Sequence, residues 1–498
     1  MGAAGPLSVQ PVTDLARDSR AEYERRVHRS VGRWPTSTAG STPALGGLRA
    51  SVALAWLLTC AALAMAAPAI EVTPSDGVVL EGQPLAVRVT GLVPGQVATL
   101  HAVRRFERYP QGEEPYRGSA RFAAGADGVV DLATAVPLAG SSYSRADGAG
   151  LFWSMQQAPA ATSTPPSGTV ELTLEVSGSP VVRRVVRLDV AAPGVVMRDV
   201  RASGVVGVFA QQPGAALQRA VLVLGGSEGG LFTARALAPR LASHGFAVLG
   251  IATFQRHAEE PLPVPQDQQE LPLEALAAAR RWLQAQAGVQ ADAVAVVGVS
   301  KGAELGLVAA SVYPWIRAVA AFTPSHVVWE GVPAPGAPPG SPRSSWSFEG
   351  QALPFVRWSL AAEQRGQQQR RASGSSRLTE AHLESLAEYA QDVPRATIPV
   401  ERAQAALFLA AGVDDGVWPA AYAVERIAAR LKAAGYRHPV QLEVVLTGHQ
   451  LLGTGWAPTT AFQRGAGRLQ GGTAALDAAA QAALWRRLIT FLRTNLPP

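Results

Sequence analysis

The stretch that decides the fold is Val296-Val-Gly-Val-Ser-Lys-Gly-Ala-Glu-Leu305, in which an apolar, strand-forming run changes into a helix-forming one. Gly298-Val-Ser-Lys-Gly302 lies at the junction and has the Gly-x-Ser-x-Gly spacing of a nucleophile elbow. A strand-to-helix turn this tight has no space for side chains two residues before or after the serine. We therefore expect Ser300 to stand above a sheet, with the backbone N–H of Lys301 directed at a developing oxyanion.

The flanks of this pentapeptide distinguish the elbow from an ordinary Gly-rich turn. Residues 294–298 are rich in β-formers, and residues 303–310 are Ala- and Leu-rich. Five residues alone would fit either interpretation. A strand directly before the turn and a helix directly after it favour the elbow.

A nucleophilic serine needs a base, and the base needs a carboxylate to orient it. With this elbow, the acid and then the histidine follow the serine along the chain. Residues 405–412 are typical of a buried strand and lead into Asp414 and Asp415, while residues 441–446 predict the next strand, which leads into His449. Both groups therefore follow the carboxyl ends of strands, the edge where open α/β sheets place their sites.

Other polar side chains near these motifs have less specific interpretations. His326 is the main competitor as base, but it precedes the acid and so breaks the chain order. His382 lies in a helical segment, where we expect it to be solvated. Glu304 lies one turn beyond the serine and is expected to make structural hydrogen bonds. No His, Cys, Asp or Glu cluster has metal-ligand spacing, so neither a metal nor another cofactor is predicted.

A second oxyanion donor is expected from a loop that follows an early strand. Gly225-Gly-Ser-Glu-Gly-Gly230 follows an apolar run at 220–224, and its glycines permit close approach of a backbone to a ligand. A phosphate loop is the alternative, but neither Gly-x-Gly-x-x-Gly nor a following Gly-Lys-Ser/Thr is present. We therefore predict a backbone donor here, supplied by Ser227 or by the neighbouring Glu228, with Ser227 preferred.

Composition predicts a protein with a sizeable core and two or three domains. The chain has 498 residues, of which 48% are hydrophobic and 16% charged. Its net charge of +6 comes almost wholly from arginine, because lysine occurs only at Lys301 and Lys432. No basic stripe is interleaved with aromatic residues, so we predict no nucleic-acid partner. The sequence leaves the oligomeric state open.

The N-terminal residues 1–66 have the pattern of a leader. Arg49 precedes an apolar core at 52–66 that ends in the small-x-small triplet Ala64-Met65-Ala66. This arrangement is typical of a secretory signal peptide and is short for a membrane-spanning helix. We predict export, with membrane contact only through this segment if it stays attached. A cytoplasmic or membrane-tethered protein is the alternative. Cys60, the single cysteine, lies inside the apolar core.

The remainder of the chain divides by its periodicity into two predicted domains. Residues 68–195 contain short runs of alternating apolar and polar residues separated by turn residues, which predict an immunoglobulin-like β-sandwich. From 198 to 498, strands alternate with helices, which predicts a mostly parallel, doubly wound sheet. A Pro/Gly-rich and Gln/Arg-rich insertion at about 331–378 is predicted to form a lid.

Taken together, the motifs resemble the acyl-CoA thioester hydrolase / bile acid-CoA:amino acid N-acyltransferase family, from about residue 70 to the end. That family joins an immunoglobulin-like domain to an α/β-hydrolase domain. The segments that carry the resemblance are Gly125–Ala133, Ala139–Ser144, Gly150–Ser154, Gly298–Leu307, Ile398–Arg402, Val413–Pro419 and Gly448-His449.

The resemblance implies a role for each member of the site. Ser300 corresponds to the nucleophile, Asp415 to the orienting acid and His449 to the base, with Asp414 the weaker candidate for the acid. The conjugating members use cysteine, so a serine implies the hydrolytic branch. We therefore expect a serine acyl hydrolase that acts on a small-molecule thioester, acyl-CoA first. The alternatives are an exported carboxylesterase, an acyl-CoA:amino acid N-acyltransferase or, more remotely, a non-catalytic binding module.

Overall fold

A computed structural model describes residues 67–108, 112–214, 217–256, 261–337, 340–465 and 467–496. The predicted leader, with its apolar core and Cys60, lies outside these ranges. Ala66 onward forms one compact unit. Within the described ranges, no helix has the length and hydropathy needed to cross a membrane.

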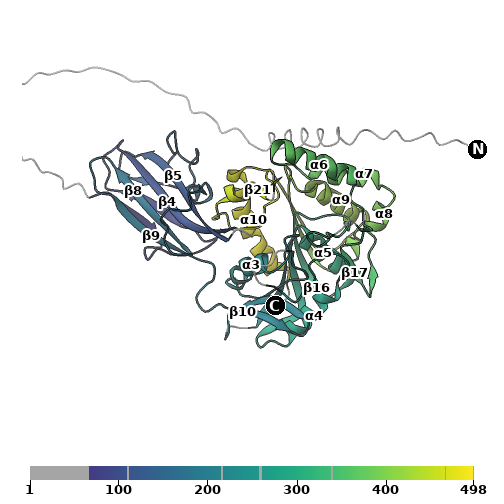
Figure 1. Ribbon diagram of the computed structural model, residues 1–498. Helices are drawn as coiled ribbons and strands as arrows, with labels where there is room; N and C mark the ends of the chain where they lie inside the picture. The colour runs from purple at the N-terminus through teal and green to yellow at the C-terminus, as the bar shows by residue number, and fades with distance from the viewer. Residues whose placement is uncertain are drawn as a thin grey trace, which may run out of the picture. The chain divides into compact units, whose positions relative to one another are not determined.

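The first part of this unit consists of β-strands in two sheets, with the orders β1-β3-β6 and β2-β9-β8-β4-β5-β7 (Figure 1). The elements are β1 (Ala69–Thr73), β2 (Val78–Leu80), β3 (Ala86–Thr90), β4 (Val97–Arg108), β5 (Gly112–Ala123), β6 (Val130–Asp131), α2 (Gly150–Trp153), β7 (Gln156–Gln157), β8 (Thr169–Val176) and β9 (Val182–Asp189). Alternate residues of β8 are buried, as expected for a strand with one face on a core. The immunoglobulin-like topology and the domain limits remain predictions.

An eight-stranded sheet of order β10-β11-β13-β12-β15-β16-β19-β20 organises the second part. Its strands are β10 (Val196–Ala202), β11 (Val205–Gln211), β12 (Gln218–Leu224), β13 (Phe246–Ile251), β15 (Val289–Val299), β16 (Ile316–Phe322), β19 (Ala406–Gly412) and β20 (Val440–Val445). In this order, the six strands from β13 to β20 are parallel to one another. At the edge beyond β13, β11 is antiparallel to both of its neighbours, β13 and β10. The predicted mostly parallel sheet is therefore confirmed, with an additional edge hairpin.

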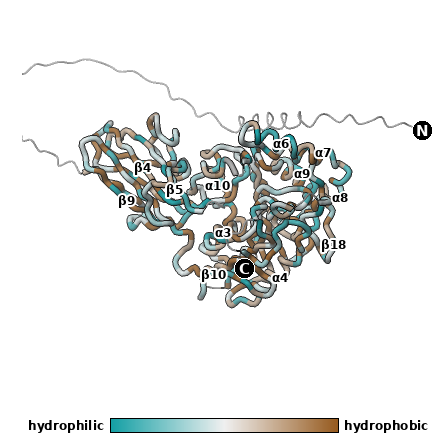
Figure 2. Tube along the Cα trace, viewed as in Figure 1, coloured by the Kyte–Doolittle hydropathy of each residue, from teal (hydrophilic) through white to brown (hydrophobic). Residues whose placement is uncertain are grey.

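Helices cover both faces of this sheet. One face packs on α4 (Glu274–Gln284), α5 (Lys301–Val312) and α9 (Ala420–Ala433), and the other on α3 (Phe232–Ala242) and α10 (Ala474–Asn495). Alternate residues of β12 belong to the two cores: Leu222 and Leu224 to one, Val221 and Val223 to the other. Strands buried on both faces are continuously apolar, which explains the brown strands at the centre of this part in Figure 2.

An insertion separates β16 from β19. Its elements are β17 (Trp346–Phe348), β18 (Gln351–Ala352), α6 (Leu360–Ser373), α7 (Thr379–Glu388) and α8 (Val393–Ala396). β17 pairs with β14 (Leu271–Pro272), which attaches the start of the insertion to the main body. The helices are green in Figure 1, and much of α6 is hydrophilic in Figure 2. That this segment acts as a lid remains a prediction.

Candidate active site

Ser300 lies between β15 and α5 in a backbone conformation that L-residues seldom adopt, with φ of 54° and ψ of −119°. Such a conformation costs about 1–3 kcal/mol and persists only where the surroundings enforce it. A Cβ at Gly298 would lie 2.3 Å from the carbonyl oxygen of Gly302, and a Cβ at Gly302 would lie 2.3 Å from that of Leu224. The two glycines are therefore obligatory. The Ser300 hydroxyl makes no capping bond to α5.

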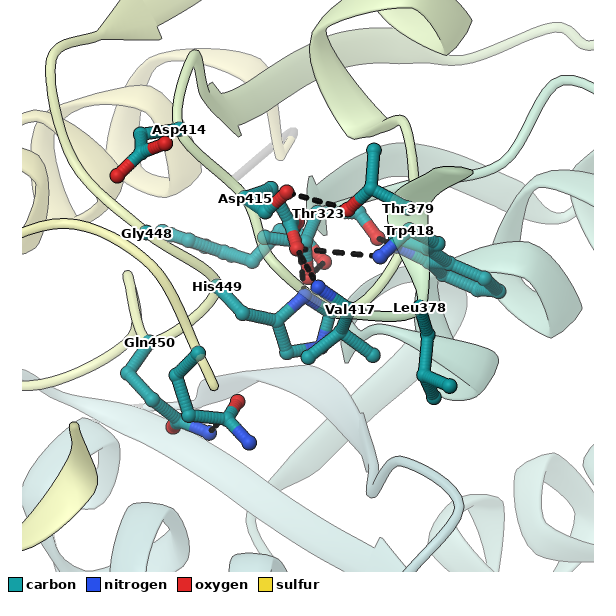
Figure 3. Close-up of polar contacts among 12 residues, drawn as sticks. Thr323, Leu378, Thr379, Asp414, Asp415, Val417, Trp418, Gly448, His449 and Gln450 are labelled. Carbon is teal, nitrogen blue, oxygen red and sulfur yellow. Dashed lines mark hydrogen bonds and ion pairs between the residues drawn. The ribbon is translucent and has the colours of Figure 1, made fainter. Parts of the chain in front are cut away.

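Asp415 and His449 form a buried hydrogen-bonded pair, with Oδ2 of the aspartate 2.8 Å from Nδ1 of the histidine (Figure 3). Oδ1 of Asp415 accepts bonds from the backbone N–H groups of Val417, at 2.8 Å, and Trp418, at 3.2 Å. An ionised carboxylate can only accept, so Nδ1 of His449 is the donor. In the neutral ring Nε2 is then left as an acceptor, the state that a general base requires.

Asp414 adjoins Asp415 in sequence but has different partners. In Figure 3 its carboxylate points away from the imidazole of His449. Oδ1 lies 3.0 Å from a guanidinium nitrogen of Arg377, and Oδ2 accepts from the backbone N–H of Gly472 at 2.9 Å. Asp414 therefore joins two loops and does not face the histidine.

The three candidate catalytic residues follow the carboxyl ends of parallel strands in neighbouring positions of the sheet. Ser300 follows β15, Asp415 follows β19 and His449 follows β20, and only β16 separates β15 from β19. The indole of Trp418 donates to the Thr323 carbonyl at 2.9 Å, and its ring lies 6.3 Å from that of His449. No hydrogen bond joins Ser300 to His449 within the described residues, and in ligand-free enzymes this contact commonly tightens only around substrate.

The loop that carries His449 is anchored by α10. Asp477, on the first turn of that helix, accepts bonds from the Thr447 hydroxyl and from the backbone N–H of Gly448. Burial raises the pKa of Asp477, and these donors oppose the increase. The backbone N–H of His449 is held in turn by the Gln470 carbonyl, at 2.9 Å. Sequence analysis missed Asp477, because no local pattern links a helix start to a loop earlier in the chain.

The Gly-rich loop after β12 lies against the serine. A Cβ at Gly226 would lie 3.4 Å from Cβ of Ser300. The N–H of Gly226 is occupied by Oε1 of Glu228, at 3.0 Å, and the same oxygen accepts from the hydroxyl of Thr233, at 2.6 Å. Ser227, between these residues, is exposed. The side chain of Glu228 therefore shapes the loop in which the predicted donor lies.

Lys301 begins helix α5, and its side chain enters a buried polar network. Nζ lies 3.1 Å from Oε1 of Glu304 and 2.6 Å from the Ser345 hydroxyl. Glu304 also accepts from the Trp329 backbone N–H and from the Trp346 indole. Burial lowers the pKa of Lys301 and raises that of Glu304, and their attraction opposes both shifts. The expected structural role of Glu304 is confirmed, since it joins the elbow helix to the insertion.

The solvated state expected for His382 is wrong, because three indoles surround the ring. Its centroid lies 4.8 Å from that of Trp329, 4.5 Å from Trp358 and 5.9 Å from Trp418. Nδ1 bonds the Leu378 carbonyl at 3.0 Å, and burial lowers the pKa of this histidine to about 3. It is therefore neutral at ordinary pH.

His326, the competing base, is also buried. Burial first, and then the charge of Arg426, lower its pKa to about 4. Its Nδ1 has no hydrogen-bond partner, and its ring packs on Tyr422. A histidine that makes no bond to a carboxylate lacks the orienting group that His449 has. Across the described ranges, no three His, Cys, Asp or Glu side chains are grouped so as to hold a metal ion.

An elbow serine and a histidine–carboxylate pair at one edge of a mostly parallel sheet define an enzyme of the α/β-hydrolase class. Two family models match this chain. "Acyl-CoA thioester hydrolase/BAAT N-terminal region" matches residues 82–202, and "BAAT / Acyl-CoA thioester hydrolase C terminal" matches residues 271–498, together more than half of the chain. The chain therefore belongs to the acyl-CoA thioester hydrolase / bile acid-CoA:amino acid N-acyltransferase family, and it is a hydrolase.

Curated relatives match over much of the chain. Acyl-coenzyme A thioesterase 6 of Mus musculus is 27% identical over 427 residues, which are 83% of this chain and 94% of the relative. Acyl-coenzyme A thioesterase 1 of Rattus norvegicus is 28% identical over 429 residues, again 83% and 94%. Acyl-coenzyme A amino acid N-acyltransferase 2 of Mus musculus is 32% identical over 250 residues, which are 47% of this chain and 56% of the relative.

Solved structures also match at low scores. A dienelactone hydrolase-like promiscuous phosphotriesterase from metagenomic libraries aligns with a TM-score of 0.37 and 15% identity, over 61% of this chain and 100% of its own. An acylaminoacyl peptidase of Pyrococcus horikoshii aligns with a TM-score of 0.39 and 9% identity, over 82% of this chain and 55% of its own.

Proposed function

We propose that this hydrolase is a serine thioesterase that cleaves acyl thioesters, acyl-CoA first among them, through an acyl-enzyme on Ser300. The observation that carries the proposal is the 2.8 Å bond between Asp415 and His449. This bond leaves Nε2 of the histidine free to accept a proton, and the serine stands at the same edge of the sheet. The curated thioesterases that align along most of the chain favour a thioester over other acyl substrates.

In the first step, Nε2 of His449 takes the Ser300 hydroxyl proton while Oγ attacks the thioester carbonyl carbon. The tetrahedral oxyanion is held by the backbone N–H of Lys301 and by a second N–H from Ser227. The C–S bond then breaks, and the thiol leaves with the proton that the imidazolium returns. Asp415 stabilises the imidazolium and remains ionised.

In the second step, water replaces the thiol. His449 takes a proton from the water, whose oxygen attacks the acyl-enzyme carbonyl and forms a second oxyanion in the same hole. Collapse of this intermediate breaks the ester bond to Ser300 and releases the carboxylic acid. The serine recovers its proton from His449, so one water is consumed for each thioester.

Two other reactions fit the same site. An amine in place of water would give an amide, as the name of the mouse N-acyltransferase relative indicates for that protein. An exported enzyme would encounter esters in place of acyl-CoA, and we retain export as a proposal from the apolar segment at 52–66. The elbow serine favours water as the acceptor, since the conjugating members of the family use cysteine.

The test combines labelling with product analysis. Wild-type protein and Ser300→Ala are treated with a fluorophosphonate probe and then assayed on acyl-CoAs, p-nitrophenyl esters and acyl-CoA with glycine. We expect labelling of the wild type alone, release of free acid, and a loss in Ser300→Ala on the order of 10⁴–10⁶ in kcat. Near-normal turnover by a folded Ser300→Ala protein would sink the serine mechanism, and an amide as main product would replace hydrolysis with transfer.

A further inference from the structure

Three arginines near the candidate site have no carboxylate partner among the described residues. Arg256 follows β13, Arg370 lies in α6, and Arg468 lies in the short strand β22 (Arg468–Leu469). Arg377, another arginine near the site, differs from these three because it is paired with Asp414 and with Glu380. Unpaired cations are ordinary on an open surface, but here they come together.

Contacts between the insertion and β22 bring two of these side chains close to each other. Arg370 donates to the Ser376 hydroxyl at 2.8 Å, and Ser376 pairs through its backbone with Arg468. Cδ of Arg370 lies 3.5 Å from the position that a Cβ would take at Gly467, the residue before Arg468. The side chain of Arg370 therefore lies against the short strand that carries Arg468.

The charge of the third arginine acts on Arg468. Although Arg468 is exposed as a residue, the pKa of its guanidinium is lowered by desolvation first and then by the positive charges of Arg370 and Arg256, which the more weakly coupled Glu363 opposes. Burial also lowers the pKa of Arg256. Among the described residues, the positive charges of Arg370 and Arg256 act on Arg468 more strongly than the negative charge of Glu363, which gives a local excess of positive charge.

Backbone contacts place this cluster beside the candidate catalytic loops. Arg256 lies two residues after Phe254, whose carbonyl accepts from Gly230 of the Gly-rich loop at 2.8 Å. Arg468 lies two residues before Gln470, whose carbonyl holds the N–H of His449. The cluster therefore adjoins both loops that the mechanism uses.

We propose that Arg256, Arg370 and Arg468 form a phosphate-binding site for the leaving-group half of the thioester, a thiol that carries a nucleotide diphosphate such as CoA. The inference rests on the proposed thioesterase function, since it assigns the thiol side of that substrate. Guanidinium groups match phosphate oxygens through paired N–H donors, and the bound anion would relieve their mutual repulsion. The acyl chain carries no charge and would lie elsewhere.

Such a site acts on substrate binding more than on the chemical step. The phosphates do not change during cleavage of the C–S bond, so their contacts stabilise ground state and transition state alike. Loss of one contact should therefore raise KM and leave kcat nearly constant. A charge-assisted hydrogen bond contributes enough to change KM roughly tenfold. Salt should weaken these contacts as well.

The kinetic test compares one acyl group on CoA, on dephospho-CoA and on pantetheine. For the wild type we expect KM to rise as phosphates are removed. In Arg256→Gln, Arg370→Gln and Arg468→Gln, the ratio of kcat/KM for the CoA thioester to that for the pantetheine thioester should fall roughly tenfold each. Arg371→Gln is the matched control, because this exposed side chain points about 100° away from Arg370 on the same helix. Equal wild-type KM values for the three thioesters would overturn the site.

A binding measurement separates this proposal from the proposed function. Calorimetric titration with CoA, pantetheine and inorganic diphosphate is carried out on the wild type and on the triple Arg→Gln variant, without turnover. We expect the wild type to bind CoA most tightly and the triple variant to lose most of that affinity. If no thioester is hydrolysed, the thioesterase proposal fails, and this CoA result still decides the phosphate site. Equal CoA affinity in both proteins, or diphosphate binding as tight as CoA, would refute the leaving-group assignment.

Discussion

Oδ2 of Asp415 lies 2.8 Å from Nδ1 of His449, whereas Asp414, the preceding residue, bonds Arg377 and the backbone N–H of Gly472. Two adjacent carboxylates at the end of one strand thus serve different purposes. Because only one of them contacts the imidazole, the contribution of each to catalysis can be separated by single substitutions.

Asp415→Asn should reduce kcat on the order of 10⁴-fold, because an amide nitrogen facing Nδ1 would favour the wrong tautomer of His449. Asp414→Asn keeps the size of a group that faces elsewhere and should change kcat less than tenfold. Steady-state rates on one thioester decide the ranking. A larger loss in Asp414→Asn would transfer the orienting role to that residue.

The buried pair of Lys301 and Glu304 should matter for stability. Lys301→Met leaves a buried carboxylate without its cation and should lower the free energy of unfolding by about 3–5 kcal/mol. Adding Glu304→Gln should recover part of this loss, because the buried charge is then gone. Urea unfolding of both single variants and the double variant measures the coupling.

The exposed pair of Arg365 and Glu384 is the matched control for that experiment, since its side chains are 58% and 46% exposed. Its removal should change the free energy of unfolding by less than about 1 kcal/mol. Equal losses at the buried and the exposed pair would contradict the anchoring role of the Lys301 network.

Glu228 should act as a positioning residue for the Gly-rich loop. In Glu228→Ala the bonds from Gly226 and Thr233 are lost, so the loop beside Ser300 should be less well ordered and kcat should fall roughly tenfold. Glu228→Gln retains an acceptor oxygen and should recover most of the rate. The measurement is kcat against KM on one substrate. A change confined to KM would argue against a role in oxyanion stabilisation.

Burial of neutral His382 should make the protein sensitive to acid. Its folded pKa of about 3 lies below the ordinary value of 6.5, so between these values the unfolded chain binds more protons. Stability should therefore fall as pH decreases from 6.5 toward 3, by at most about 1.4 kcal/mol per pH unit for this one group. His382→Gln should show a shallower decline in urea midpoints. An unchanged slope in His382→Gln would refute the assignment.

Location can be tested directly. If residues 52–66 form a signal peptide, protein purified from the exported fraction should begin near Ala67. N-terminal sequencing of fractionated cells reads the start of the chain. An intact N-terminus in the cytosolic fraction would contradict export and would strengthen acyl-CoA as the everyday substrate.

Most elements of the fold could be predicted from local patterns. The buried strands Ala406–Gly412 and Val440–Val445 coincide to within a residue with the runs at 405–412 and 441–446 that predicted them, and the apolar run at 220–224 lies in the strand Gln218–Leu224. The strand Gly112–Ala123 was missed, because Pro115 and Gly118 interrupt its pattern. The edge hairpin formed by β10 and β11 was missed as well, although its second strand is apolar throughout much of its length.

The residues of the candidate site likewise fall into those that the sequence could identify and those that it could not. Ser300, with its obligatory glycines, was identifiable because the elbow is a local motif with a fixed spacing. Asp477 and the aromatic surroundings of His382 were not, since the partners come from segments far apart in the chain. A histidine in a helical segment has the same sequence pattern whether it faces water or three indoles.

By itself, the sequence determined the order and type of the main elements and the short motifs that name Ser300, Asp415 and His449 as candidates. These depend on periodicity, glycine positions and chain order, which are properties of neighbouring residues. Only the tertiary structure decided which aspartate faces the imidazole, that His382 is buried, and that the segments carrying Arg256 and Arg468 lie beside the loops. Those relationships arise where loops and helices distant in sequence pack together, and no local preference encodes such packing.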